Sequence, residues 1–299
     1  MKTTLKALFG IAAACAVCAA GQPANAGELV GGWNYGIDSF RDGSGGSKYD
    51  IKGMAIKETE ESVFVALTGG TPLDGVKDNR ATGGYIGWGD LFFNFSDDDF
   101  ATALANGDVL GVNFAPHDGG GERGVYQVNS LKGIGKLNRG YKSMKQYFGW
   151  AKKKASLGTE FSAHNKAGKT AVYKYLYGSE AANSPNHKNT KLVNVIDEGS
   201  WLGGIDLLGI DDLKGEGLNF GLADGGMFGT QTFGFKFSRD LLPSGEYLAH
   251  LFLECGNDSI ALAGELDEAQ ETPEPTSWLG AIAVGLTMAG SRLRKRTRA

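Results

Sequence analysis

Short apolar runs bounded by glycine, asparagine or aspartate recur along the middle of the chain. Glycine is abundant, at 47 of 299 residues, and 10% of the residues are aromatic. Glycine supplies the positive φ angles of tight turns, but it destabilises the interior of a helix. In one run Phe233, Phe235 and Phe237 alternate with a glycine and a lysine, the two-residue period of a strand with one buried face. The sequence therefore predicts an all-β fold and excludes a mainly helical bundle.

The runs predict about ten strands joined by short turns. They cover residues 49–57, 62–67, 86–95, 109–114, 124–128, 192–196, 217–222, 230–237, 247–254 and 259–263. Such a series is typical of a single β-sandwich or a jelly-roll-like domain. The charged segment between Ile56 and Val63 is expected to be the tip of a hairpin. One short helical insertion is expected over residues 141–154, which are rich in lysine, methionine and aromatic residues.

The first 26 residues have the three parts of a secretory signal peptide. Lys2 and Lys6 form a basic start, an apolar run follows, and a triplet of small residues ends at Ala26. Signal peptidase is expected to cut after Ala26, because small residues at the first and third positions before the cut favour cleavage. The mature chain would then begin at Gly27, outside the cytoplasm.

A second targeting segment lies at the C-terminal end of the chain. An acidic linker, residues 267–275, ends in Pro273-Glu274-Pro275, and the uncharged stretch 276–291 comes next. As a helix this stretch would span about 24 Å, marginally short of a bilayer core of about 30 Å. The tail, residues 292–299, is basic; its charges are Arg292, Arg294, Lys295, Arg296 and Arg298. By the positive-inside rule this tail is expected to stay in the cytoplasm while the preceding domain is exported.

The order of Pro-Glu-Pro, short apolar helix and arginine-rich end resembles the PEP-CTERM sorting signal, which exosortases recognise in bacteria. The strings at 33–40, 87–95 and 249–258 are similar to those of exosortase-dependent surface proteins. The resemblance implies that the inner membrane holds the chain transiently. An exosortase-type processing enzyme would then cut it near Pro275 and release it to the cell surface, outer envelope or extracellular matrix. It implies no known activity, and an ordinary single-pass tail anchor is the alternative.

Between the signal segment and the sorting segment lies an acidic ectodomain, for which we expect a β-sandwich over residues 27–266. Residues 27–275 contain 23 basic and 34 acidic side chains, a net charge of −11, whereas the whole chain carries −4. Nucleic acids and anionic membrane surfaces are recognised through basic footprints. The charge therefore argues against nucleic acid as a partner and is compatible with binding of cations.

Catalytic chemistry has little support among the thiol and imidazole side chains. Cys255 is the single cysteine of the mature domain, so no internal disulfide can form, and it alternates in phase with Leu251 and Leu253, which indicates a buried, inert thiol. The four histidines are far apart and show no zinc-binding spacing. His250 and Glu254 share a strand face but would lie about 13 Å apart, so a structural histidine is expected.

Two acidic loops could offer oxygen ligands to Ca²⁺, a hard cation that takes several oxygens. One loop contains Asp38 and Asp42 among glycines and serines, and the other contains Asp97, Asp98 and Asp99. Neither has the spacing of an EF-hand, and solvated turns are the alternative. No cofactor is required by the sequence, and Ca²⁺ is the one that it allows.

Several aromatic side chains could stack on sugar rings if one face of the domain exposes them. The candidates are Trp33, Tyr35, Trp88 and Trp201. As single aromatics in apolar strands, such residues more often belong to the core, which is the alternative.

Taken together, these features predict an exported, exosortase-sorted, non-enzymatic protein of the cell surface or extracellular matrix. Its role would be structural or glycan-contacting, with extracellular polysaccharide as the expected partner. One alternative is a Ca²⁺-dependent adhesin or lectin. Another is an exported carbohydrate-active hydrolase, which would need two carboxylates about 5–10 Å apart in an aromatic-lined cleft.

Overall fold

A computed structural model describes residues 27–38, 47–117, 120–143, 145–146, 172, 174–179, 191–223 and 225–268. The expected signal segment with Ala26, the loop residue Asp42, and the expected sorting segment with Pro273, Glu274, Pro275, Arg292, Arg294, Lys295 and Arg296 lie outside these residues. No helix in the described part of the chain is long and apolar enough to cross a membrane.

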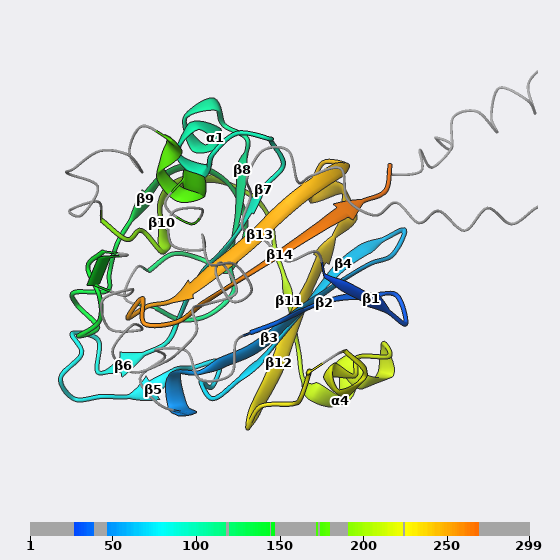
Figure 1. Cartoon of the computed structure of the whole chain (residues 1–299), viewed down its shortest axis with the longest axis horizontal. Coiled ribbons are helices and arrows are strands. Elements are labelled where there is room, and N and C mark those ends of the chain that lie inside the picture. The colour runs from blue at the N-terminus through cyan, green and yellow to red at the C-terminus, as the bar shows by residue number, and fades with distance from the viewer. Residues whose placement is uncertain are drawn as a thin grey trace, which may run out of the picture. The chain divides into compact units, whose positions relative to one another are not determined.

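The described residues form two six-stranded antiparallel sheets and one two-stranded ribbon (Figure 1). In spatial order the first sheet contains β1 (Glu28–Val30), β2 (Trp33–Ile37), β3 (Ile51–Glu58), β4 (Ser62–Gly69), β12 (Gln231–Ser238) and β11 (Asp206–Leu208). The second contains β10 (Val195–Gly203), β9 (Gly124–Lys132), β8 (Val109–Asn113), β7 (Trp88–Asn94), β13 (Gly245–Leu253) and β14 (Ser259–Leu266). The ribbon pairs β5 (Val76–Lys77) with β6 (Tyr85–Ile86). The prediction of a mainly β chain in antiparallel sheets is confirmed.

One hydrophobic core receives side chains from both large sheets. Phe233, Phe235 and Phe237 of β12 contribute to it, as their alternation predicts, and Leu91 and Phe93 of β7 contribute from the second sheet. The sheets are also joined at an edge, where the side-chain amide of Asn34 on β2 donates to the carbonyl of Ala263 on β14 at 2.9 Å. Because β14 is an edge strand of its sheet, this bond gives one edge carbonyl a partner.

Short helical segments cover the outer faces of both sheets. On the first sheet, α4 (Ile210–Gly215) and the 3-10 turn η4 (Phe220–Leu222) pack on Trp33 and Phe64. On the second, α1 (Phe100–Asn106) and the helical residues 174–179 pack on Phe92 and Phe252. Strands buried on both faces are almost continuously apolar, which is why β4 and β13 lack a clear alternation.

The helices differ from the single insertion expected over residues 141–154. Both α1 and α4 lie elsewhere, and of the expected insertion only 141–143 and 145–146 are described, with 145–146 helical. Residues 217–222 form no strand, because η4 occupies their end, so that prediction is wrong. The local signals for α1 are its caps: Asp99 accepts the Thr102 N–H at 3.1 Å, and Gly107 closes the helix at φ 83°.

Candidate functional site

Three carboxylates from distant parts of the chain meet where strands begin or end. Asp38 follows β2, Asp50 precedes β3 and Asp258 precedes β14. One oxygen atom from each lies within 4.8 Å of the other two. Asp38 and Asp258 are buried, and Asp50 is partly exposed. This acidic cluster is the group of side chains in the described residues that best fits a cation.

Backbone contacts hold the acidic cluster in place. The two carboxylate oxygens of Asp258 accept the backbone N–H groups of Ile51 and Ser259, at 2.7 and 2.9 Å. The backbone N–H of Asp38 donates to the carbonyl of Lys52 at 3.1 Å. Because Asp258 belongs to the β13–β14 turn and Ile51 begins β3, this carboxylate ties the second sheet to the first.

The charges of the acidic cluster favour a cation. Lys52 contributes one ammonium group, 2.8 Å from Asp50, so the formal charge of the three aspartates and this lysine is −2. Two like charges 4 Å apart repel by about 1 kcal/mol in water and by about 4 kcal/mol at an effective dielectric constant of 20. Ca²⁺ takes about 6–8 oxygen ligands, so the three residues would supply part of its coordination sphere.

The structure brings Asp38 into this cluster but not the second predicted acidic loop. Asp97, Asp98 and Asp99 join no such group of three among the described residues. Asp99 caps α1, accepting from the backbone and the hydroxyl of Thr102 at 3.1 and 2.9 Å. Its carboxylate therefore has a structural use already.

The prediction that aromatic rings could stack on sugars is wrong for three of the four candidates. Trp33, Tyr35 and Trp88 are 0 to 2% exposed, so no sugar can reach their rings. Both indole N–H groups donate within the protein, Trp33 to the carbonyl of Glu216 and Trp88 to that of Pro72. Trp201 is 51% exposed on β10, an edge strand, and remains a candidate.

His250 is the structural histidine that the sequence predicts. It is 1% exposed, its Nδ1 lies 3.1 Å from the hydroxyl of Tyr175, and Phe92 and Phe100 pack against its ring. Burial lowers the pKa of His250 to about 3, so the ring is neutral at physiological pH. The prediction for Cys255 is likewise confirmed, because burial raises the pKa of this thiol to about 12.

Asp90 and His117 form a buried pair that no sequence motif indicates. Oδ1 of Asp90 lies 3.1 Å from Nε2 of His117, and these side chains are 0% and 1% exposed. The second oxygen of Asp90 accepts the Ile196 N–H at 2.7 Å. Burial alone would lower the pKa of His117, but the hydrogen bond and charge of Asp90 and the charge of Glu254 outweigh burial and raise it. The pair is sealed from solvent, so its geometry fits a structural role rather than acid–base catalysis.

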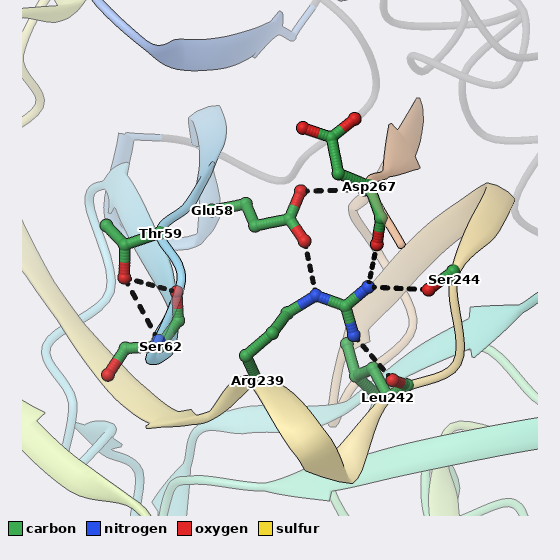
Figure 2. Close-up of polar contacts among 7 residues, drawn as sticks. All are labelled: Glu58, Thr59, Ser62, Arg239, Leu242, Ser244 and Asp267. Carbon is green, nitrogen blue, oxygen red and sulfur yellow. Dashed lines mark hydrogen bonds and ion pairs between the residues drawn. The ribbon is translucent and has the colours of Figure 1, made fainter. Parts of the chain in front are cut away.

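Arg239 is also buried, and its guanidinium joins three segments of the chain (Figure 2). Nε donates to Glu58 at the end of β3, Nη1 donates to the Leu242 carbonyl at 2.6 Å, and Nη2 donates to Ser244 and to the carbonyl of Asp267. The other oxygen of Glu58 accepts the Asp267 N–H at 3.0 Å. This network fastens the residue that follows β14 to the end of β3.

Asp50 and Asp258 of the acidic cluster were not among the residues predicted from the sequence. Their one local signal is position, since each directly precedes a strand, as Asp38 directly follows one. No family model, curated protein or solved structure gave a significant match to this chain, so its function has to be argued from its own residues.

Proposed function

We propose that this chain is an exported protein with a single β-sandwich, jelly-roll-like domain that is sorted to the cell surface, outer envelope or extracellular matrix. Signal peptidase cuts it after Ala26, the inner membrane holds it transiently, and an exosortase-type enzyme cuts it near Pro275. The observation that carries this proposal is the order of segments along the chain. A signal-like start and a Pro-Glu-Pro, apolar and arginine-rich end enclose strands that run from Glu28 to Leu266.

The role of the exported domain is structural or glycan-contacting, without catalysis. The use of its buried polar side chains supports this role. Asn194, for example, accepts the Ile134 N–H at 3.1 Å and donates to the carbonyls of Leu253 and Glu254, both at 3.0 Å. Asp258 and Arg239 likewise bind backbone groups of neighbouring segments, so these polar side chains stabilise the fold. The exposed ring of Trp201 offers a stacking surface for a sugar.

Cell fractionation tests the sorting step. Replacing Pro273, Glu274 and Pro275 with alanine should leave the uncut chain in the inner membrane, because the processing enzyme loses its recognition sequence. The matched control replaces residues 270–272 of the same linker with alanine and should be released like the natural chain. Normal release of the Pro-Glu-Pro variant would refute the sorting proposal.

A glycan array tests the role, using the full chain in Ca²⁺ and in chelator. Binding that falls when Trp201 is replaced by alanine would support glycan contact at β10. If no glycan binds under either condition, the glycan-contacting role is refuted and the structural role is retained.

The acidic cluster favours a second candidate function, Ca²⁺-dependent adhesion or lectin activity. In this proposal Asp38, Asp50 and Asp258 hold a Ca²⁺ ion between β2, β3 and β14. The ion would relieve the repulsion among the three carboxylates and stabilise the loops beside them. A carbohydrate-binding surface built from those loops would then depend on Ca²⁺.

Thermal unfolding with Ca²⁺ and with chelator tests this second candidate. Ligand at about 100 times its Kd stabilises a folded protein by about 2.7 kcal/mol, which for a domain of this size raises Tm by roughly 5–10 °C. The double variant Asp38→Asn, Asp50→Asn should lose this response, whereas Asp211→Asn, on the exposed side of α4, should keep it. If the Tm of the natural chain is the same in Ca²⁺ and in chelator, a Ca²⁺ site at the acidic cluster is excluded.

A further inference from the structure

A lysine-rich cavity lies beside the turn that follows β9. Its volume is about 810 Å³, and its charged lining consists of Lys132, Lys136, Lys142, Lys145, Lys191 and Asp197. Lys132 ends β9, and Asp197 lies in β10, its neighbour in the sheet. The cavity is thus a concentrated basic site in a domain whose net charge is −11.

Most of this positive charge is uncompensated. Asp197 pairs with Lys132, with its Oδ1 atom 3.1 Å from Nζ. Among the described residues, no carboxylate forms an ion pair with Lys136, Lys142, Lys145 or Lys191, and all four lysines are exposed. The described residues that line the cavity therefore have a formal charge of +4. Ammonium groups gathered in this way repel one another, and an anion placed among them removes that repulsion.

The walls of the cavity are held rigidly from behind. The Leu192 N–H donates to the carbonyl of Lys142 at 2.9 Å, and the Asn194 N–H donates to that of Lys132 at 3.1 Å. The fully buried Asn194 side chain accepts the Ile134 N–H from the turn at 3.1 Å. The backbone that carries the lysines is therefore fixed before a ligand arrives, which lowers the entropy lost on binding.

We propose that this cavity binds an acidic oligosaccharide, whose carboxylate or sulfate groups pair with Lys136, Lys142, Lys145 and Lys191. A cavity of this volume lies within the range that encloses a small-molecule ligand, so it can accommodate a few sugar units. Asp197 adds a carboxylate that can accept a hydrogen bond from a sugar hydroxyl. That the ligand is an extracellular polysaccharide rests on the proposed export of the chain, whereas the binding of acidic sugars rests on the cavity alone.

The lining favours an acidic glycan over a nucleic acid. Among the described residues, its lining contains no arginine and no aromatic side chain, so this part of the wall offers neither the guanidinium forks nor the stacking platforms with which proteins bind phosphates and bases. Duplex DNA also carries one negative charge per about 1.7 Å. A polyanion of that density that extends beyond the cavity meets a domain with a net charge of −11, and the repulsion opposes binding.

Fluorescence anisotropy with a labelled hexagalacturonate and the purified full chain tests the proposal. The triple variant Lys136→Gln, Lys142→Gln, Lys145→Gln should weaken binding by about tenfold or more, since each exposed ion pair contributes modestly. The control Lys48→Gln, Lys77→Gln, Lys174→Gln makes the same change in net charge outside the cavity and should weaken it less than about twofold. Near-UV circular dichroism of both variants verifies that they are folded.

Three further probes identify the ligand chemistry. A heparin hexasaccharide distinguishes sulfate from carboxylate preference, and tighter binding of either acidic sugar than of the other two probes supports the proposal. Neutral maltohexaose should not bind. The third probe is a single-stranded hexanucleotide. Each of four results would overturn the proposal: maltohexaose binds as tightly as the acidic sugars, both triple variants weaken binding equally, the hexanucleotide binds more tightly than the acidic sugars, or no acidic sugar binds. None of these outcomes bears on the release of the chain from the inner membrane, which fractionation measures separately.

Discussion

Replacing Arg239 with alanine removes the only group that joins Glu58, Leu242, Ser244 and the Asp267 carbonyl in the described structure. The side chain of Arg239 is 2% exposed, and that of Glu58 is 19% exposed. Breaking a buried ion pair by removing one partner costs about 3–5 kcal/mol, because the remaining charge and its neighbours are left buried without partners. Since Glu58 retains some contact with water, we expect the lower end, about 3 kcal/mol.

Urea unfolding followed by circular dichroism measures this loss. With a slope of about 3 kcal/mol per molar urea, the midpoint of Arg239→Ala should fall by about 1 M with an unchanged slope. The urea midpoint of Arg239→Lys should lie between those of Arg239→Ala and the natural chain, because an ammonium group keeps the charge but cannot reproduce the planar set of donors. Arg80→Ala is the control, since it removes an exposed pair with Asp78 and should barely move the midpoint. Equal effects of Arg239→Ala and Arg80→Ala would refute the reasoning.

Three further predictions concern two buried side chains and one tightly packed glycine. Because burial lowers the pKa of His250 to about 3 from 6.5, only the unfolded chain binds this proton between those pH values. The His250 contribution is therefore complete above pH 6.5 and is lost as the pH falls. At pH 5 the natural chain should lose about 2 kcal/mol relative to His250→Gln in urea unfolding, and identical pH profiles would contradict this. Cys255, with a pKa of about 12, should react with a thiol reagent at pH 8 only after unfolding; rapid labelling of the folded chain would show that it is accessible. Gly140→Ala would place Cβ 1.7 Å from the carbonyl oxygen of Cys255 and should lower the unfolding free energy by at least about 2 kcal/mol. The control Gly215→Ala, with open space around the new Cβ, should be neutral or stabilising. Similar unfolding free energies for the two variants would refute the steric argument.

The sequence predicted the strands well where one face is polar or where a turn is strongly marked. The hairpin between Ile56 and Val63 forms as expected, with Glu58 opposite Val63, and β12 buries the three phenylalanines that alternate. Prediction failed where tertiary contacts decide. Residues 217–222 are apolar like a strand, but Phe220 is packed on Tyr35 by the 3-10 turn, with ring centroids 5.4 Å apart.

The candidate sites were harder to predict because they depend on pairs far apart in sequence. Asp38 was a candidate, but its partner Asp258 comes from the last turn of the domain, and only the packing of the two sheets brings them together. The acidic net charge also gave no indication that part of the surface could bind an anion. Four of the five lysines in the cavity lie between 132 and 145, yet the acidic total of the domain conceals this local concentration, and Lys191 joins them only through the strand pairing of β9 with β10.

Both ends of β14 are fastened to β3, and this arrangement decides how the domain resists a force applied to the chain after residue 267. At its start, Asp258 accepts the N–H of Ile51, the first residue of β3. At its end, Asp267 is held by Glu58, the last residue of β3, and by Arg239. Because Asp267 immediately precedes the chain that leads to Pro273, a pull on the linker acts first on the Arg239 network. Loss of that network should therefore loosen β14 from its C-terminal end, while the Asp258 contact still holds its first residue.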